Sequence, residues 1–246
     1  MARGGRIEAR ADFVKYNPNY CKFMNPLRIF LVAALILVVF GTDNADAEEM
    51  PPMWISNNIG EVSQVAISAD GEYIVAGDYF GSLYLFNKNS NTPLWTYNAI
   101  REANNCDCER SVYSVSISAD GNYIAIGGDH YSVELFHKDS NEPLWRYNTV
   151  GNTGGGVAVG TVAISANGEY ITAGDYDGEI YLFDKDSSTP LWNYTISATF
   201  AVRDVSISAD GEYIIASTSD QTVHLFDKDS STPLWSYTNA DDGFNQ

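Results

Sequence analysis

The chain has 246 residues, of which 45% are hydrophobic and 13% aromatic, and it carries a formal net charge of −18 at pH 7. Beyond Ala47 the imbalance is stronger, because only eight Lys and Arg residues stand against 28 Asp and Glu residues. So acidic a surface repels phosphates, which excludes general nucleic-acid binding and favours solubility or a cationic partner.

The N-terminal part of the chain has the composition of a targeting segment. Residues 29–40 form an apolar run that is short for a membrane-spanning helix of about 20 residues and typical of the core of a secretory signal. Arg28 precedes the run, and Ala45-Asp46-Ala47 follows it as an A-x-A cleavage pattern. We therefore expect a secreted or extracytoplasmic protein.

Two alternatives stay open for this segment. Either residues 24–47 are a signal peptide that is cleaved after Ala47, or they form an uncleaved anchor that holds the protein to the membrane through residues 27–40. Residues 1–23 form a basic extension that is unusual for a signal, and translation from Met24 instead of Met1 would omit it.

Beyond a linker and one extra outer strand at 48–61, a sequence unit recurs four times, and a short tail follows. The units and the tail span 62–98, 112–148, 159–195, 202–238 and 239–246. Each unit has a strand-like run ending in Ile-Ser and closes on Pro-Leu-Trp. The step from this Ser to this Pro is always 25 residues: Ser68–Pro93, Ser118–Pro143, Ser165–Pro190 and Ser208–Pro233. Such a tandem unit predicts a repeat architecture.

Each unit predicts four short strands, which in the first unit lie at about 62–68, 73–78, 82–87 and 93–98. Ala-Asp-Gly or Ala-Asn-Gly forms a tight turn between the first two strands. Pro starts the fourth strand, where a missing N–H is tolerated. Four strands per unit are typical of a β-propeller blade, so we predict an all-β fold with four complete blades.

The blades resemble two known families. The string ISADGEYIVAG…LYLFNK resembles a WD-repeat blade, although Phe86 and its equivalents stand where that family has Trp, and its turn Asp is matched only by Asp177 and Asp220. The closing Pro-Leu-Trp resembles the quinoprotein type of blade. The resemblance covers about residues 52–239 and implies a β-propeller. Because the hydrogen-bonded tetrad of WD blades is largely absent, we expect aromatic packing to hold the blades.

The number of units is small for a propeller. Rings of this kind usually close with about six to eight blades, and the strand at 52–58 is redundant because the fourth unit has its own outer strand at 233–238. We therefore expect one chain to form an open arc with an exposed apolar face. Either two chains close the ring as a homodimer, or the chain is a truncated piece of a longer propeller.

Length variation is confined to the connections between units. The longer ones, at 99–112 and 149–161, are expected on one face of the fold, where insertions usually carry binding. We expect a non-enzymatic binding module whose partner is a protein or a surface glycan. The alternative is a fragment of a larger propeller, such as a quinone-dependent oxidoreductase, without activity of its own.

No catalytic, cofactor-binding or metal site is predicted. Cys106 and Cys108 favour a disulfide of some kind in an exported protein, because zinc would need two further ligands. The DKDSSTP loops at 184–190 and 227–233 lack the Gly and the distal Glu of a calcium loop, so we interpret them as capped turns. The GNTGGGVAVG connection at 151–160 is interpreted as a flexible connector, since no Lys-Ser/Thr follows it.

Two further residue types recur along the chain, but their positions do not predict a catalytic or binding site. The histidines share no spacing and receive no catalytic role: His130, His137 and His224. The tryptophans occupy one blade position and are interpreted as inter-blade core rather than as a sugar-binding stripe: Trp54, Trp95, Trp145, Trp192 and Trp235.

Overall fold

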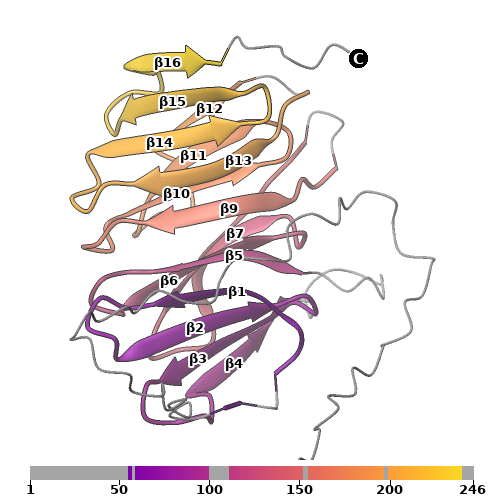
Figure 1. Ribbon diagram of the computed structural model, residues 1–246, viewed down its shortest axis with the longest axis vertical. Coiled ribbons are helices and arrows are strands. Elements are labelled where there is room, and N and C mark those ends of the chain that lie inside the picture. The colour runs from indigo at the N-terminus through magenta and orange to yellow at the C-terminus, as the bar shows by residue number, and fades with distance from the viewer. Residues whose placement is uncertain (1–54, 57–58, 100–110, 152–154, 197–198, 240–246) are drawn as a thin grey trace, which may run out of the picture. The chain divides into compact units, whose positions relative to one another are not determined.

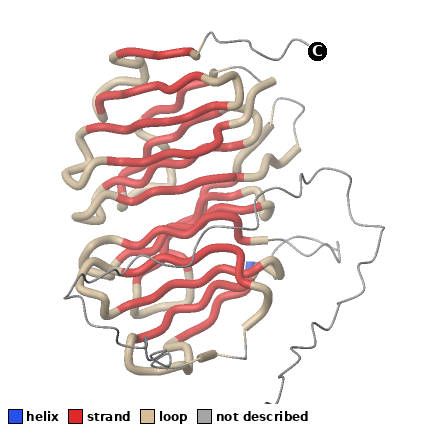
Figure 2. The backbone as a smooth tube through the Cα atoms, viewed as in Figure 1, coloured by secondary structure: helices blue, strands red, loops and turns tan. Residues whose placement is uncertain are grey.

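The computed structural model describes residues 55–56, 59–99, 111–151, 155–196 and 199–239, which form four four-stranded antiparallel sheets (Figures 1 and 2). Each sheet is one blade, so the predicted all-β propeller fold is confirmed. The predicted signal or anchor segment, most of the extra outer strand and residues 240–246 of the tail lie outside the described residues.

Every blade has its strands in sequence order, paired with their neighbours. Blade 1 comprises β1 (Val62–Ile67), β2 (Tyr73–Asp78), β3 (Ser82–Asn87) and β4 (Trp95–Asn98). Blade 2 comprises β5 (Val112–Ile117), β6 (Tyr123–Gly128), β7 (Ser132–His137) and β8 (Pro143–Asn148). Blade 3 comprises β9 (Val159–Ile164), β10 (Tyr170–Asp175), β11 (Glu179–Asp184) and β12 (Trp192–Thr195). Blade 4 comprises β13 (Val202–Ile207), β14 (Tyr213–Thr218), β15 (Thr222–Asp227) and β16 (Trp235–Thr238).

The tight turn after the first strand explains the constant spacing of the units. In blade 1 the Ser68 hydroxyl donates to Asp70 Oδ1 at 2.6 Å and accepts the Tyr73 N–H at 3.0 Å. Gly71 closes the turn with a φ of 71°, which suits a residue without a Cβ. The hydrogen bond from Ser68 lowers the pKa of the Asp70 carboxyl. The other three blades repeat both Ser hydroxyl contacts.

The hydrophobic core lies between successive blades. Val75 and Leu85 of blade 1 pack in one cluster with Val112, Ile124 and Phe136 of blade 2. Blades 2 and 3, and blades 3 and 4, form equivalent clusters. Backbone hydrogen bonds also join the blades at the tight turns, each at 3.0 Å: Ala69 N–H to Ala119 O, Ala119 N–H to Ala166 O and Ala166 N–H to Ala209 O.

Tryptophan side chains pack in three of these interfaces, as predicted. The indole Nε1 of each donates to a Lys carbonyl of the following blade, at 2.6 to 2.8 Å: Trp95 to Lys138, Trp145 to Lys185 and Trp192 to Lys228. Each indole also contacts a buried Phe of that blade. The prediction is wrong for Trp235, which is 47% exposed because no following blade covers it among the described residues. Trp54 lies outside the described residues.

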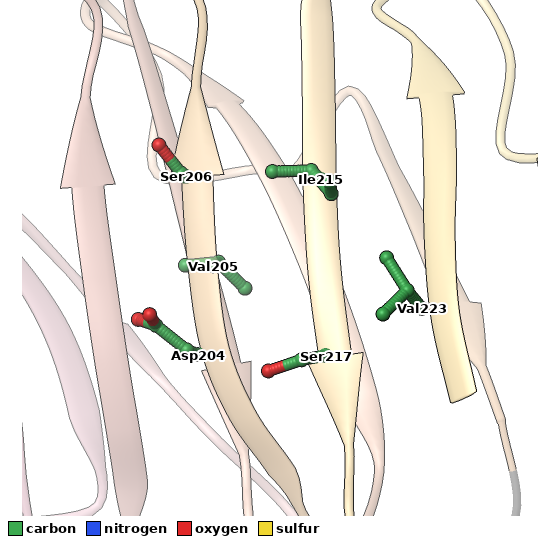
Figure 3. Close-up of a pocket in the computed structure, with 6 residues that line it drawn as sticks. All are labelled: Asp204, Val205, Ser206, Ile215, Ser217 and Val223. Carbon is green, nitrogen blue, oxygen red and sulfur yellow. The ribbon is translucent and has the colours of Figure 1, made fainter. Parts of the chain in front are cut away.

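Blades 1 to 3 each have a glycine near the end of the second strand, and close packing against the next blade explains it. A Cβ on Gly174 would lie 2.3 Å from Val202 Cγ1 of the next blade, and Gly77 and Gly127 meet equivalent valines. Blade 4 has Ser217 at this position (Figure 3). The glycine therefore marks a covered blade face.

We expect Gly174→Ala to lower the free energy of unfolding by about 1–3 kcal/mol, because the added methyl overpacks the interface of blades 3 and 4. The matched change Ser217→Ala should alter it by less than about 0.5 kcal/mol. Urea denaturation measures both, and equal losses would contradict the explanation.

Candidate ligand-binding face

One end of the blades carries both the inter-blade connections and the turns between the second and third strands. We call this end the loop face; its described residues are 78–82, 99, 111, 128–132, 149–151, 155–158, 175–179, 196, 199–201 and 218–222. Residues 100–110 and 152–154, with Cys106 and Cys108, lie outside the described residues. The described stems of both predicted binding loops, 99–112 and 149–161, therefore begin and end at this face.

Buried aspartates anchor two of the turns on the loop face. Asp78 Oδ1 accepts the N–H groups of Phe80 at 2.9 Å and Ser82 at 2.7 Å, while its Oδ2 accepts the Tyr84 hydroxyl at 2.9 Å. Asp175 repeats this arrangement with Tyr181 in blade 3. The resemblance to WD blades does not indicate either residue, because it places the turn Asp two residues later, at the position of Asp177. The Ala-Gly-Asp-Tyr shared by units 1 and 3 is the signal in the sequence that marks both.

Burial raises the pKa of Asp175 to about 6, against the lowering effect of the Glu179 N–H and the Tyr181 hydroxyl. The folded protein therefore binds the proton of the Asp175 carboxyl more tightly than the unfolded chain does, because the pKa of Asp in the unfolded chain is near 3.8. The stabilisation from this group is complete below about pH 4 and is lost as the pH rises to about 6.

We expect the stability advantage of the native protein over Asp175→Asn to fall by about 2 kcal/mol between pH 4 and pH 6. Denaturant unfolding at several pH values measures it, and the comparison cancels the other carboxyl groups. A difference that does not change with pH would show that Asp175 titrates normally.

Blades 2 and 4 hold their turns differently. In blade 2, Gly128 and Glu134 replace the Asp–Tyr pair, and Glu134 accepts from the Ser132 hydroxyl at 2.9 Å with His130 Nε2 at 3.6 Å. In blade 4, Asp220 accepts the Thr222 N–H at 3.1 Å. The histidines do not meet: His130 is buried beside Glu134, His137 lies by Tyr123, and His224 contacts Tyr194.

Aromatic residues from two blades, flanked by charges, meet where β5 reaches the loop face. A β-bulge places Tyr113 in β5, and its ring centroid lies 6.2 Å from that of Tyr176 in blade 3. Gly160 leaves room for Tyr176, because a Cβ there would lie 2.6 Å from the ring. Burial raises the pKa of both phenols; Asp129 adds to the rise at Tyr113, and Arg203 of blade 4 opposes it at Tyr176.

The stem of the second long connection is folded against the loop face. Thr149 donates its N–H and its hydroxyl to the Tyr131 carbonyl, both at 2.9 Å, and Gly151 N–H donates to Gly155 O at 2.6 Å. Val150 and Gly156 form a β-bridge. The described residues of GNTGGGVAVG thus form a hydrogen-bonded stem, and the interpretation of the connection as flexible stays a prediction.

Tyr131 adopts an unfavourable backbone conformation in an exposed position. Its φ is 61°. Blades 1 and 3 have Gly81 and Gly178 at this position, and blade 4 has Gln221 with a φ of 67°. A non-Gly residue in this region costs about 1 kcal/mol, and such costs cluster at functional sites. Large aromatic side chains of the loop face are exposed in every blade, at 38 to 47%: Phe80, Tyr131, Tyr176 and Phe200.

The described residues do not bring together a metal site: no group of three or more His, Cys, Asp or Glu side chains is placed to hold a cation. The DKDSSTP loops are capped turns, as predicted. The Asp186 N–H donates to Asp184 at 2.8 Å and the Thr189 N–H to Ser187 at 3.0 Å, and the loop of blade 4 repeats both bonds.

Comparison with known families agrees with this architecture. The chain matches the model described as outer membrane protein assembly factor BamB over residues 52–204 and again over 129–243. The chain belongs to this family. Membership in the BamB family confirms the quinoprotein-like resemblance, whereas the WD-type resemblance stays a prediction. No curated protein matches the chain. Within the ranges that the structure describes, no helix is long and apolar enough to span a bilayer.

Proposed function

We propose that this member of the BamB family is a non-enzymatic, extracytoplasmic binding module whose loop face contacts a partner protein. The observation that carries the proposal is Tyr131, which is exposed and held at a φ of 61° by a closed stem. Blades 1 and 3 have Gly at this position and blade 4 has Gln221 with a φ of 67°, so blade 2 is the blade that places an aromatic side chain there.

The other properties of the loop face support a protein partner. Exposed aromatic residues flanked by Asp129 and Arg203 are typical of protein interfaces, which are rich in Tyr, Phe and Arg. Trp95, Trp145 and Trp192 pack between blades, which argues against a tryptophan stripe for a surface glycan. The description of the family's namesake as an assembly factor also favours contacts with proteins.

The proposed location rests on the sequence. The apolar run at 29–40 and the A-x-A pattern at 45–47 favour export, and the namesake of the family acts in outer membrane protein assembly according to its description. The non-enzymatic part of the proposal rests on the scattered histidines, which lie in three different environments.

Photo-crosslinking in the native envelope tests the proposed face. A photoreactive aromatic amino acid placed at Phe80, Tyr131 or Tyr176 should give the same discrete adduct with one protein. Matched probes at Asn141 and Thr232, which are exposed in loops at the opposite end of the strands, should give none. Adducts that form equally from both ends, or only from the control positions, would refute the proposal.

Tyr131→Gly separates binding from folding. Because Gly accepts a positive φ without strain, we expect this variant to be as stable as the native protein or slightly more stable. We expect it to reduce the adduct from Phe80 at least fivefold. An unchanged adduct would show that Tyr131 does not contribute to binding.

A further inference from the structure

The outer strand of blade 3 carries the acceptor motif of N-linked glycosylation. Asn193-Tyr194-Thr195 fits the pattern Asn-x-Ser/Thr, in which the middle residue is not Pro. It is the one match to this pattern in the sequence. Because so short a pattern also arises by chance, its meaning depends on whether the fold presents the Asn amide and the Thr hydroxyl together at the surface.

Strand β12 presents the two polar residues of the motif on one side and anchors the tyrosine on the other. Side chains alternate along an extended strand, so Asn193 and Thr195 point to the same side. Both are exposed, whereas Tyr194 is half-buried, and its ring centroid lies 5.2 Å from that of Phe226 in blade 4. Packing of the tyrosine therefore holds the strand with the polar residues of the motif toward solvent.

The edge of the sheet leaves space for a bulky group on the motif. Strand β12 is the outermost strand of blade 3 and pairs with β11. Its other edge has no neighbouring strand among the described residues. A sugar on the exposed Asn193 amide therefore extends from the rim of the blade, outside the apolar cluster between blades 3 and 4.

A carboxylate on β11 holds both polar groups of the motif. Glu179 Oε2 accepts a hydrogen bond from Asn193 Nδ2 at 2.9 Å, and Glu179 Oε1 accepts one from the Thr195 hydroxyl at 2.5 Å. The Asn amide nitrogen carries two hydrogens. A sugar replaces one of them, so the nitrogen keeps one N–H as a donor. The contact with Glu179 is thus compatible with a modified Asn193.

The other blades form the same strand with different residues at the two polar positions. The equivalent pairs are Thr96 and Asn98, Arg146 and Asn148, and Ser236 and Thr238. Because four different pairs occupy these positions, formation of the strand does not require Asn193 and Thr195. Among the four described blades, blade 3 is the one that combines an Asn at the first position with a Thr at the second.

We propose that Asn193 is N-glycosylated in the native protein. The co-substrate is a sugar whose anomeric carbon is linked to a phosphate. The Asn193 amide nitrogen forms a bond to this carbon, the bond between the carbon and the phosphate oxygen breaks, and the amide proton passes to the leaving phosphate. The inference rests on the proposed extracytoplasmic location, because the motif marks an acceptor in exported proteins.

A sugar at this position also protects the sheet. The unpaired edge of an outer strand is a template for pairing with another chain, and proteins blunt such edges with charges, Pro or a covering segment. The sugar on Asn193 covers the edge of β12 in the same way.

Peptide mass spectrometry of the full chain, isolated from its native envelope, tests the proposal. The peptide that contains Asn193 should carry an added mass that fragments as whole sugar residues. Asn193→Gln and Thr195→Val should each abolish this mass, whereas Thr195→Ser should retain it because the hydroxyl is kept. Thermal melting verifies that each variant folds, and Asn193→Gln alone is sufficient if Thr195→Val does not.

Two asparagines of the native chain are internal controls. Asn98 and Asn148 are exposed on the outer strands of blades 1 and 2 but lie outside the motif. Their peptides should have the mass of the unmodified sequence. Sugar on these asparagines, or sugar that persists in Thr195→Val, would show that modification does not depend on the motif and would overturn the proposal.

An unmodified Asn193 in the native protein would also overturn the proposal. Fractionation of the cells in the same experiment separates this failure from a failure of the proposed function. Unmodified protein in the envelope fraction contradicts the modification and leaves the binding module as proposed. Unmodified protein confined to the cytoplasm contradicts the proposed location as well.

Discussion

Replacing Trp192 by Ala is expected to lower the free energy of unfolding by about 3–5 kcal/mol. The indole lies 5.4 Å from the Phe226 ring, and its Nε1 donates to the Lys228 carbonyl at 2.8 Å. The substitution removes this packing between blades 3 and 4 and leaves the carbonyl without its donor. Chemical denaturation monitored by circular dichroism measures the loss.

The repeat supplies the control for this prediction. Trp235 is the same residue at the same blade position but is 47% exposed. We expect Trp235→Ala to cost less than about 1 kcal/mol. If the two substitutions were equally costly, tryptophan would act within its own blade and not between blades.

Arg146→Met is expected to cost about 3 kcal/mol, because it leaves Glu134 buried without its cation. Glu134 is 1% exposed, and its Oε1 lies 3.0 Å from Arg146 Nε. Arg146 also donates to the Tyr97 hydroxyl of blade 1 at 2.6 Å, so the pair joins blades 1 and 2. Burial raises the pKa of Tyr97, and Glu134 adds to the rise.

A double variant distinguishes loss of the pair from loss of packing. Glu134→Met combined with Arg146→Met removes both charges and keeps the apolar volume, and such replacements are often close to neutral. We expect it to be within about 1 kcal/mol of the native protein in the same denaturation assay. A double variant as unstable as Arg146→Met alone would mean that the arginine acts by packing.

The strands and their order could be predicted because the same strand and turn pattern recurs in four units of the sequence. The alternation of Tyr, Val and Ile and the Ser-Ala-Asp-Gly turn are local signals, and the first unit's strands differ from the predicted bounds by at most two residues. Aromatic packing between blades was predictable for the same reason, since Trp95, Trp145 and Trp192 keep one position in the unit.

The features that could not be predicted depend on what lies beside a unit. Trp235 follows the same DKDSSTPL sequence as Trp192, yet it is 47% exposed, because no further blade covers it among the described residues. Nothing in the local sequence indicates whether another blade covers the tryptophan. Tyr131 was visible as a departure from Gly81 and Gly178, but its significance depends on the positive φ of that position. Asp78 and Asp175 were missed because a buried carboxylate among backbone N–H donors is a tertiary feature.

The proposed function depends on a contact between the loop face and a partner protein. Photo-crosslinking in the native envelope, from Tyr131 on the loop face and from Asn141 at the opposite end of the strands, tests this contact most directly. We expect one discrete adduct from Tyr131 and none from Asn141. An adduct of equal yield from Asn141, or none from Tyr131, would contradict the proposed contact.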